Sequence, residues 1–414
     1  MPSFRHVFAP VMVLFLLVWG CTSEQAADLD DALALYRENE LENALPLFER
    51  VVDQQNDHVE ARTWLAETYR RLGMKDEAVK TAAKALEQEP CNSFAHTIIA
   101  DACRRPPGER GLKDSDTTWV HLCKAVSCDS TDGNPWASIW CEAILREKFE
   151  LMQKSVRKMK ETGFLTKAVL AYARWMLRSL PENAILLTNG DMDTFPPLAL
   201  QVTEGFRPDV VVVERGQLDL IQFLRYIRDH CAVPLPFPDS DLDSLTRLED
   251  GHGNVISVSD QIFRGWVDLA ISGSFPRPIA LSVTVDEIFF TGFKEYLRYS
   301  GPFLLLHSTP VEGAPATDLL ERSLADIRAE DFTGPWTSVK DRSPVRGLYT
   351  KYIAANVTEA ALAFGEGLIK ERKYNEAKKI LSWAEEYEKT TELGSVFGER
   401  ISRLKETAEA KETD

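Results

Sequence analysis

The first quarter of the chain carries a pattern of small and apolar residues that repeats every 34 residues. One period contains, in order, Leu65-Ala66, Tyr69, Gly73, Ala78, Ala85 and Pro90. Equivalent positions one period away are occupied by Ala32, Ala44, Val51, Ile99, Ala100 and Cys103. Small residues at this spacing allow two helices to cross closely, and a glycine suits the turn between them. The pattern therefore predicts a series of antiparallel helix pairs.

These positions resemble the tetratricopeptide repeat over residues 26–104. The pattern breaks at a loop from Arg104 to Gly108, returns more loosely between residues 110 and 164, and predicts a last helix pair between Ala361 and Glu386. The resemblance implies stacked helix pairs with a concave surface that binds a protein or peptide partner. The alternative is an arm that only packs against the rest of the chain.

The second half of the chain alternates between strand-like and helix-like patterns. Continuous β-branched or apolar runs at 184–188 and 209–214 are typical of buried strands, and helical patterns surround them at 167–180, 198–204 and 217–231. A strand, a helix and a strand within about 30 residues form a βαβ unit, which requires parallel pairing. Further strands are expected at 279–285 and 303–307. We therefore expect a chain of the α/β plus all-α class. Tetratricopeptide-type helical repeats come first, then a compact α/β domain with a mostly parallel sheet, then a closing C-terminal helical repeat.

The segment after the first predicted strand contains the candidate chemistry. It reads Asn189-Gly190-Asp191-Met192-Asp193-Thr194-Phe195. Open α/β sheets bind ligands at the carboxyl ends of their strands. Asp191 and Asp193 provide carboxylates, Thr194 a hydroxyl, Asn189 an amide and Phe195 a flat apolar ring. These five residues are candidates for binding a divalent cation or a sugar.

A structural role for the same segment is the alternative, because Asp193 or Thr194 also suits the start of the following helix, with prolines in its first turn. Carboxylates of Asp191 and Asp193 that converge on an open pocket would favour a ligand site. If these carboxylates instead accept hydrogen bonds from backbone amides, the segment serves as a helix cap. We name no catalytic residue and leave a metal ion open.

The N-terminus predicts export. Arg5 and His6 precede an apolar run of about 13 residues, which is short for a membrane span of about 20 residues, and Gly20-Cys21 follows. This resembles the signal peptide and lipidation site of a bacterial lipoprotein, with Cys21 as the lipidated residue. Trp19 stands where such sites usually have a small residue, so the alternative is an ordinary signal peptide followed by a chance cysteine. We expect a lipoprotein anchored in the bacterial envelope and facing the periplasm or the cell exterior.

Charge and cysteine content narrow the function classes. The 414 residues include 64 acidic and 48 basic ones, a net charge of −16, which argues against a nucleic-acid partner. Five of the seven cysteines lie between residues 91 and 141, and export would permit a local disulfide there, whereas buried thiols are the alternative. Glycine-rich phosphate loops and the common hydrolase motifs are absent from the sequence, and we expect no cofactor.

Three strings in the second half resemble one family. They are residues 181–196, 205–210 and 277–284. Together they are similar to the soluble C-terminal region of bacterial multi-pass membrane proteins that form a domain family of unknown function and are likened to protein O-mannosyltransferases. The resemblance covers about residues 165–390. In such lipid-linked glycosyltransferases the catalytic carboxylates lie in membrane-embedded loops, which this sequence lacks. The resemblance therefore implies an accessory domain.

These observations predict a division of the chain and a function. The expected parts are a signal peptide at 1–20, a tether at 21–27, repeats at 28–164, the α/β domain at 165–345, a helical repeat at 346–404 and a frayed tail at 405–414. We expect an envelope lipoprotein that acts as a protein-interaction scaffold without catalysis. The alternatives are a glycan- or lipid-linked-sugar-binding accessory protein of a glycosylation system, or a metal-dependent hydrolase or transferase that uses the Asp191–Thr194 loop.

Overall fold

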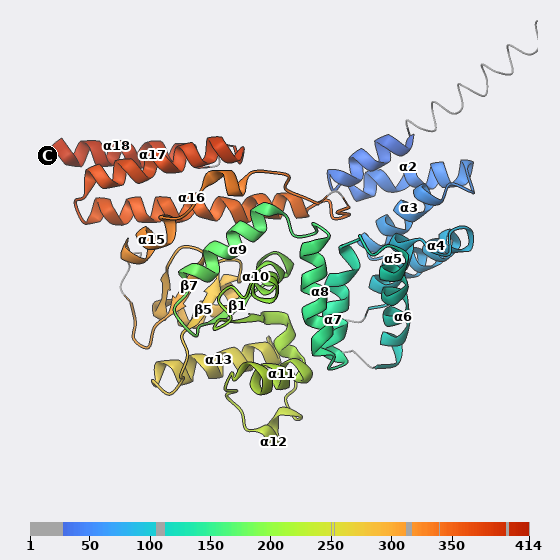
Figure 1. Ribbon diagram of the computed structural model, residues 1–414, viewed down its shortest axis with the longest axis horizontal. Helices are drawn as coiled ribbons and strands as arrows, with labels where there is room; N and C mark the ends of the chain where they lie inside the picture. The colour runs from blue at the N-terminus through green and yellow to red at the C-terminus, as the bar shows by residue number, and fades with distance from the viewer. Residues whose placement is uncertain are drawn as a thin grey trace, which may run out of the picture. The chain divides into compact units, whose positions relative to one another are not determined.

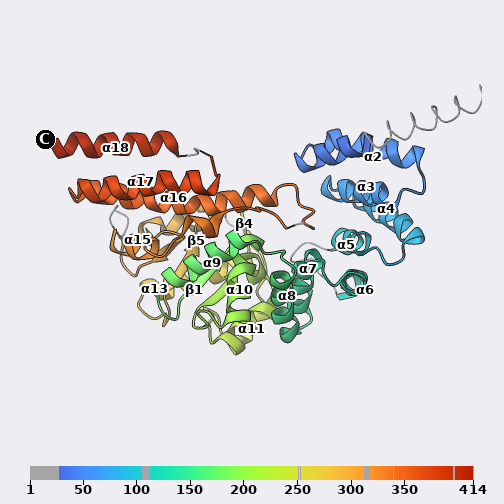
Figure 2. The same ribbon diagram turned by 45° about the horizontal axis from the view of Figure 1, so that its top comes forward.

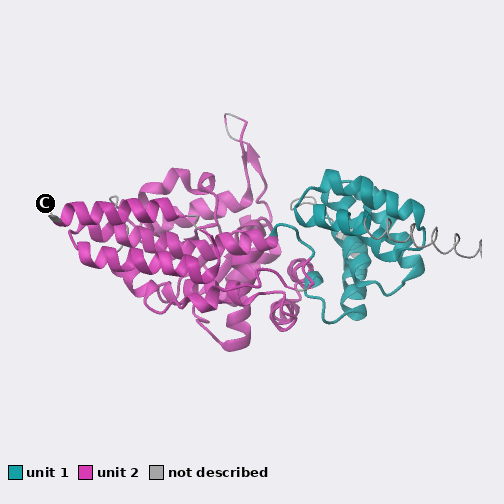
Figure 3. Cartoon of the chain, turned by 90° about the horizontal axis from the view of Figure 1, so that it is seen from above, with its two compact units in different colours: residues 1–105, 110–135, 342–345 teal, residues 106–109, 136–341, 346–414 magenta. Residues whose placement is uncertain are grey.

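A computed structural model describes residues 28–104, 112–249, 251, 253–311, 317–338, 340–394 and 397–413. The predicted signal peptide, Cys21 and the tether lie outside the described residues. The chain forms two compact units, which Figure 3 colours separately. Unit 1 comprises residues 1–105, 110–135 and 342–345, and unit 2 comprises residues 106–109, 136–341 and 346–414.

Unit 1 consists of helix pairs, which Figures 1 and 2 show from blue to cyan. A helix at 28–37 packs against α2 (Leu41–Gln54). Two further pairs follow, α3 (Val59–Arg71) with α4 (Lys75–Gln88) and α5 (Ser93–Ala102) with α6 (Leu112–Cys128). The helix pairs predicted from the 34-residue period are therefore confirmed in this unit.

Small residues allow the helices of unit 1 to approach closely. Ala66, Ala78 and Ala85 are fully buried in one apolar cluster that α3, α4 and α5 share. Gly73 lies in the turn between α3 and α4 with a φ of 80°, a conformation that residues with a side chain rarely adopt. A disulfide joins Cys91, just before α5, to Cys128 at the end of α6. The local disulfide expected among the clustered cysteines is thus present.

Unit 2 contains a mixed sheet of five strands in the order β2-β1-β5-β7-β6. The strands are β1 (Ile185–Thr188), β2 (Val211–Glu214), β5 (Ile279–Ser282), β6 (Leu297–Tyr299) and β7 (Phe303–Leu306). β1 pairs in parallel with both β2 and β5, whereas β7 is antiparallel to β5 and β6. The parallel pairing expected from the βαβ pattern is confirmed, and a β6–β7 hairpin adds the antiparallel edge.

Helices cover both faces of this sheet (Figure 1). Leu186, Val212 and Ala280 share one apolar cluster with α9 (Lys167–Ser179), α10 (Asp191–Glu204) and α16 (Arg346–Lys370). The opposite face carries α11 (Ile221–Cys231) and α13 (Val258–Ile271), whose inner side chains are also buried. From β1 the chain passes through α10 to β2 on one side, and β5 lies on the other side of β1. Such a switch in direction is where open α/β sheets offer a crevice.

The remaining elements of unit 2 frame this core. The longer helices are α7 (Asn134–Leu145), α8 (Phe149–Glu161), α15 (Thr317–Leu324), α17 (Tyr374–Thr391) and α18 (Gly398–Thr413). The short elements are α12 (Asp239–Leu242), α14 (Glu287–Phe290), a ribbon of β3 (Leu248–Glu249) and β4 (Val255–Ile256), and the 3-10 turns η1 (Arg215–Asp219), η2 (Thr291–Tyr296) and η3 (Ala329–Phe332). Helices α16, α17 and α18 lie side by side in Figures 1 and 2 and close the unit.

Two segments differ from the expected division. Residues 136–164 were expected among the repeats, but α8 packs on α10, and α7 from Trp136 onward belongs to unit 2. A frayed tail was expected from residue 405, but α18 continues to Thr413 because Ala408 is buried in the core cluster and Glu412 pairs with Lys378 at 2.6 Å. Within the described residues, no helix is both long and apolar enough to cross a membrane.

Candidate functional site

The five candidate ligand residues lie at the end of β1 and in the first turn of α10. The helix begins at Asp191 rather than at the expected residue 198, because Gly190 turns the chain with a φ of 96°. Asp191 and Asp193 therefore occupy the first turn, where the N-terminal end of a helix favours carboxylates.

Asp193 is an internal residue, with 1% of its surface exposed. Its carboxylate accepts hydrogen bonds from the Asn189 backbone N–H, at 3.1 and 3.3 Å, and from the Thr284 hydroxyl. Burial raises the pKa of Asp193, and the hydrogen bonds from Thr284 and Asn189 oppose that shift. Because Thr284 follows β5, Asp193 ties the carboxyl ends of β1 and β5 together.

Neighbouring polar groups fill the rest of this strand edge. The Asn189 side chain donates to the Thr284 carbonyl at 3.2 Å, and the hydroxyls of Thr188 and Thr194 are 2.6 Å apart. The Glu214 carboxylate at the end of β2 accepts from the backbone N–H groups of Gly190 at 3.4 Å and Gln217 at 2.9 Å, and burial raises its pKa. These polar groups at the strand edge are thus hydrogen-bonded to one another and to the backbone of the chain.

Asp191 and Phe195 point elsewhere. The Asp191 side chain is 51% exposed, and its Oδ2 lies 3.9 Å from Nη1 of Arg346. Phe195 is 3% exposed and packs edge-on against Trp140 with ring centroids 5.3 Å apart. The expected flat face for a sugar is therefore covered. Asn189, Asp193 and Thr194 come together, but the two carboxylates do not converge on a pocket.

Two cavities of unit 2 lie away from these five residues. One, of about 760 Å³, lies between α9 and the segment 323–332. The other, of about 550 Å³, is lined by residues of α8, α10 and α11 and by Arg277. None of the five candidates lines either cavity. Over the described part of the chain, no group of three or more histidine, cysteine, aspartate or glutamate side chains is placed to hold a metal ion. Ligand binding by the five residues stays a prediction.

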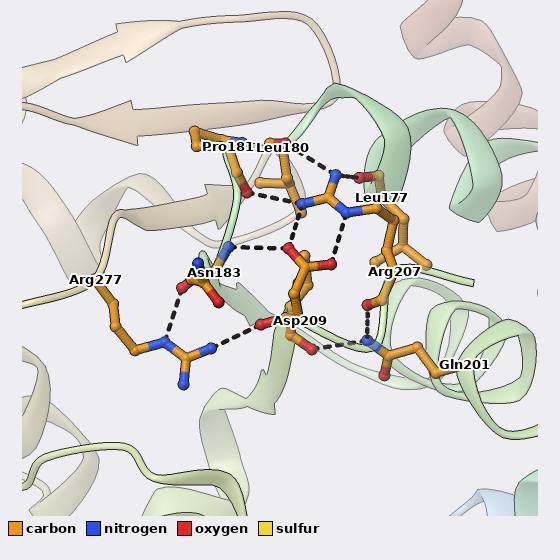
Figure 4. Close-up of polar contacts among 9 residues, drawn as sticks. Leu177, Leu180, Pro181, Asn183, Gln201, Arg207, Asp209 and Arg277 are labelled. Carbon is orange, nitrogen blue, oxygen red and sulfur yellow. Dashed lines mark hydrogen bonds and ion pairs between the residues drawn. The ribbon is translucent and has the colours of Figure 1, made fainter. Parts of the chain in front are cut away.

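A polar network at the opposite, amino edge of the sheet contains residues from each of the three strings noted in the sequence (Figure 4). The Arg207 guanidinium donates to the carbonyls of Leu177, Leu180 and Pro181 at 2.6–3.0 Å and forms a two-bond ion pair with Asp209. The Asp209 carboxylate also accepts the Asn183 backbone N–H at 2.9 Å, and the Arg207 pairing lowers the pKa of Asp209.

Arg277 completes this network from the third string. Its guanidinium donates to the carbonyls of Asn183 and Asp209, both at 2.8 Å (Figure 4). It also donates to the carbonyl of Cys231 at 3.0 Å. Arg207, Asp209 and Arg277 thus join the segments that enter β1, β2 and β5. These residues of the three strings therefore perform a structural task.

Unit 1 presents a different kind of surface, an aromatic row across the first helices of its three pairs. Tyr36, Trp64 and Phe94 lie on the 28–37 helix, α3 and α5, and their rings pack edge-on in sequence with centroids 5.1 and 4.9 Å apart. Trp64 and Phe94 are only partly buried. Tyr36 is buried at 2% exposure, so Trp64 and Phe94 provide the exposed aromatic surface of this row, which is of the kind that binds peptides.

One buried carboxylate stands at the end of this row. Asp132 is fully buried, and its Oδ1 accepts from the backbone and side-chain N–H groups of Asn134 at 3.0 and 2.8 Å. Its Oδ2 accepts from the Ser93 hydroxyl at 3.2 Å. Neither Asp132 nor the aromatic row was predicted from the sequence. The available signal was an aromatic residue on the first helix of each of three successive pairs.

Two family models match the chain, one in the region of the helical repeats and one in the region of the sheet. A family model described as tetratricopeptide repeat matches residues 25–101, and one described as TMEM260-associated domain 2 matches residues 169–232. The first match confirms the repeats expected at 26–104. The second lies in the predicted α/β domain and contains two of the three strings. The likeness to O-mannosyltransferase-like membrane proteins stays a prediction. None of the curated proteins matches the chain.

Several solved structures are similar over part or most of the chain. A tetratricopeptide-repeat protein of Thermus thermophilus is 16% identical, with a TM-score of 0.32 over 53% of this chain and 95% of that one. One from Parabacteroides merdae is 10% identical, with a TM-score of 0.30 over 93% and 99%. Yeast Tom70 is 13% identical, with a TM-score of 0.28 over 94% of this chain and 64% of that one. Identities and TM-scores are low in all three.

Proposed function

We propose that this chain is a non-catalytic, envelope-anchored lipoprotein whose helical repeats hold a protein or peptide partner. The observation that carries the proposal is the aromatic row of unit 1, in which Trp64 and Phe94 are partly exposed. The buried Asp132 carboxylate accepts a hydrogen bond from Ser93, the residue next to Phe94. The tetratricopeptide match over residues 25–101 supports it, because such repeats form surfaces for protein partners.

Two further features support the envelope location. The apolar segment before Cys21 has the length and flanks of a signal peptide. The Cys91–Cys128 disulfide suits an oxidising compartment outside the cytoplasm. We do not assign a sugar or metal site to the Asp191–Thr194 loop, since Asp193 is hydrogen-bonded internally.

Site-specific cross-linking in the native envelope tests partner binding. A photoreactive residue replaces Trp64 on the aromatic row, and a matched control carries it at Val255, an exposed site of unit 2. We expect a discrete cross-linked product from position 64 and none from position 255. Equal products from both positions, or none from position 64, would refute partner binding by the repeats.

The anchor has a separate test. In Cys21→Ser the lipid acceptor is lost, so the protein is expected to move from the membrane fraction to the soluble envelope fraction. A variant that fractionates with the membrane as the wild type does would exclude the lipoprotein assignment.

A further inference from the structure

The four residues 342–345 belong to unit 1, although both neighbours in the sequence belong to unit 2. Those neighbours, Asp341 and Arg346, form an ion pair of 2.9 Å with each other. The Arg346 guanidinium also lies 4.3 Å from the centre of the Phe164 ring. The pair closes the base of a short loop, residues 342–345, which contains neither helix nor strand and begins with Arg342.

Arg342 is bound by three residues of unit 1 in the way that a peptide ligand is bound. Its Nη2 lies 2.6 Å from the buried Asp132 Oδ2, and its guanidinium lies 4.0 Å from the centre of the Phe94 ring. Its backbone carbonyl accepts a hydrogen bond of 2.9 Å from the Tyr36 hydroxyl. The side chain is 17% exposed.

These contacts select an arginine. A flat guanidinium stacks on an aromatic ring and pairs with a carboxylate at the same time, which a compact lysine ammonium does less well. The Tyr36 hydroxyl donates to a backbone carbonyl, so this contact does not depend on the side chain of the bound residue and any extended segment can accept it. The chain's net charge of −16 also attracts a basic partner at long range.

The internal ligand fits its pocket incompletely. Nη1 of Arg342 is buried and has no hydrogen-bond partner among the residues that the structure describes, which is unfavourable for a guanidinium nitrogen. A competing segment would bind the same pocket better if the equivalent nitrogen of its own arginine had a hydrogen-bond acceptor.

We propose that Tyr36, Phe94 and Asp132 form an arginine pocket for an extended peptide segment of the partner, and that residues 342–345 fill this pocket in cis as an internal competitor. The inference rests on the proposed function, because it names the chemistry of the partner that the repeats hold. A partner must present an arginine in an extended segment and displace Arg342.

Fluorescence anisotropy with the full chain tests the pocket. The probe is a labelled synthetic peptide with the sequence of residues 340–345, and its control has alanine in place of the residue-342 arginine. Arg342→Ala in the protein should empty the pocket and tighten probe binding about tenfold or more, since the competitor is removed. The alanine peptide should bind neither protein. Equal affinities of wild type and Arg342→Ala, or equal binding of both peptides, would overturn the proposal.

Asp132→Asn in the Arg342→Ala background should abolish the gain, because it removes the charge and keeps the side-chain size. If this variant does not fold, a third peptide with lysine at the same place carries the test, and it should bind at least several-fold more weakly than the arginine peptide. Equal binding of the lysine and arginine peptides would refute the pocket. The probe comes from the chain itself, so loss of its binding with retained cross-linking at position 64 would reject the pocket alone.

Discussion

Arg207→Ala tests whether the network at the amino edge of the sheet holds unit 2 together. The substitution removes the donor shared by three carbonyls, those of Leu177, Leu180 and Pro181, and by the Asp209 carboxylate. The Arg207 side chain is 21% exposed, so water reaches only part of the gap. A buried hydrogen bond to a charged group contributes about 1.5–3 kcal/mol. Because water partly replaces the lost bonds of Arg207, we expect the substitution to lower the free energy of unfolding by about 2–4 kcal/mol in total.

Hydrogen exchange with mass spectrometry measures this effect locally. In the variant, the peptides that contain β1 and those that contain β2 should each lose about 2–4 kcal/mol of protection, because Arg207 and Asp209 join the segments that enter both strands. Arg225→Ala is the matched control, since Arg225 pairs with Asp243 on the surface at 41% and 70% exposure, and its loss should cost less than about 0.5 kcal/mol. Equal effects of the two substitutions would refute the reasoning.

The same comparison has a defined pH dependence. The Arg207 hydrogen bonds lower the pKa of Asp209 in the folded chain, so the Asp209 contribution is complete above the unfolded pKa of about 4 and is lost as the pH falls below it. The difference in protection between wild type and Arg207→Ala should therefore shrink between pH 5 and pH 3, values chosen to lie about one unit either side of that pKa. A difference that stays constant over this range would exclude the ion pair as its source.

Two further predictions concern unit 1. Ala78→Leu places a larger side chain in the buried cluster between α3, α4 and α5, so those helices should lose about 1–3 kcal/mol of protection, whereas Ala83→Leu on the exposed side of α4 should change it by less than about 0.5 kcal/mol. Equal effects would contradict close helix crossing at Ala78. The double variant Cys91→Ser and Cys128→Ser opens a loop of 37 residues and should lower the free energy of urea unfolding of unit 1 by about 4 kcal/mol. If reductant leaves the unfolding free energy of the wild type unchanged, the disulfide does not stabilise unit 1 and the prediction is wrong.

Local spacing was enough to predict the helix pairs and the buried strands. A helix turn sets which residues share a face, so small residues 12 apart within one period indicate a close crossing between neighbouring helices, as Ala66 and Ala78 show. Continuous apolar runs likewise indicated β1 and β2, because strands covered on both faces need no polar positions. β6 escaped prediction because it is only three residues long and Arg298 interrupts its apolar pattern, while its strand form depends on pairing with β7.

The candidate loop shows where local reasoning stops. The position of Asp191 to Phe195 at the end of β1 followed from the sequence, but the use of Asp193 did not, since its partner Thr284 is 91 residues away. Trp140 covers Phe195 from another distant helix. Burial and hydrogen-bond partners are properties of the packed chain, so local spacing could not predict that Asp193 and Phe195 are internal while Asp191 is exposed.

The sequence by itself determined the repeat period, the class of the second half and the place of its first strand, because these follow from the spacing of side chains along a few turns of backbone. The arginine pocket was decided by tertiary structure alone. It joins Tyr36 and Arg342 across 306 residues, with Phe94 and Asp132 between them in the sequence. A lone aspartate, a phenylalanine and an arginine have no shared period, and only folding removes the water that would otherwise weaken their attraction.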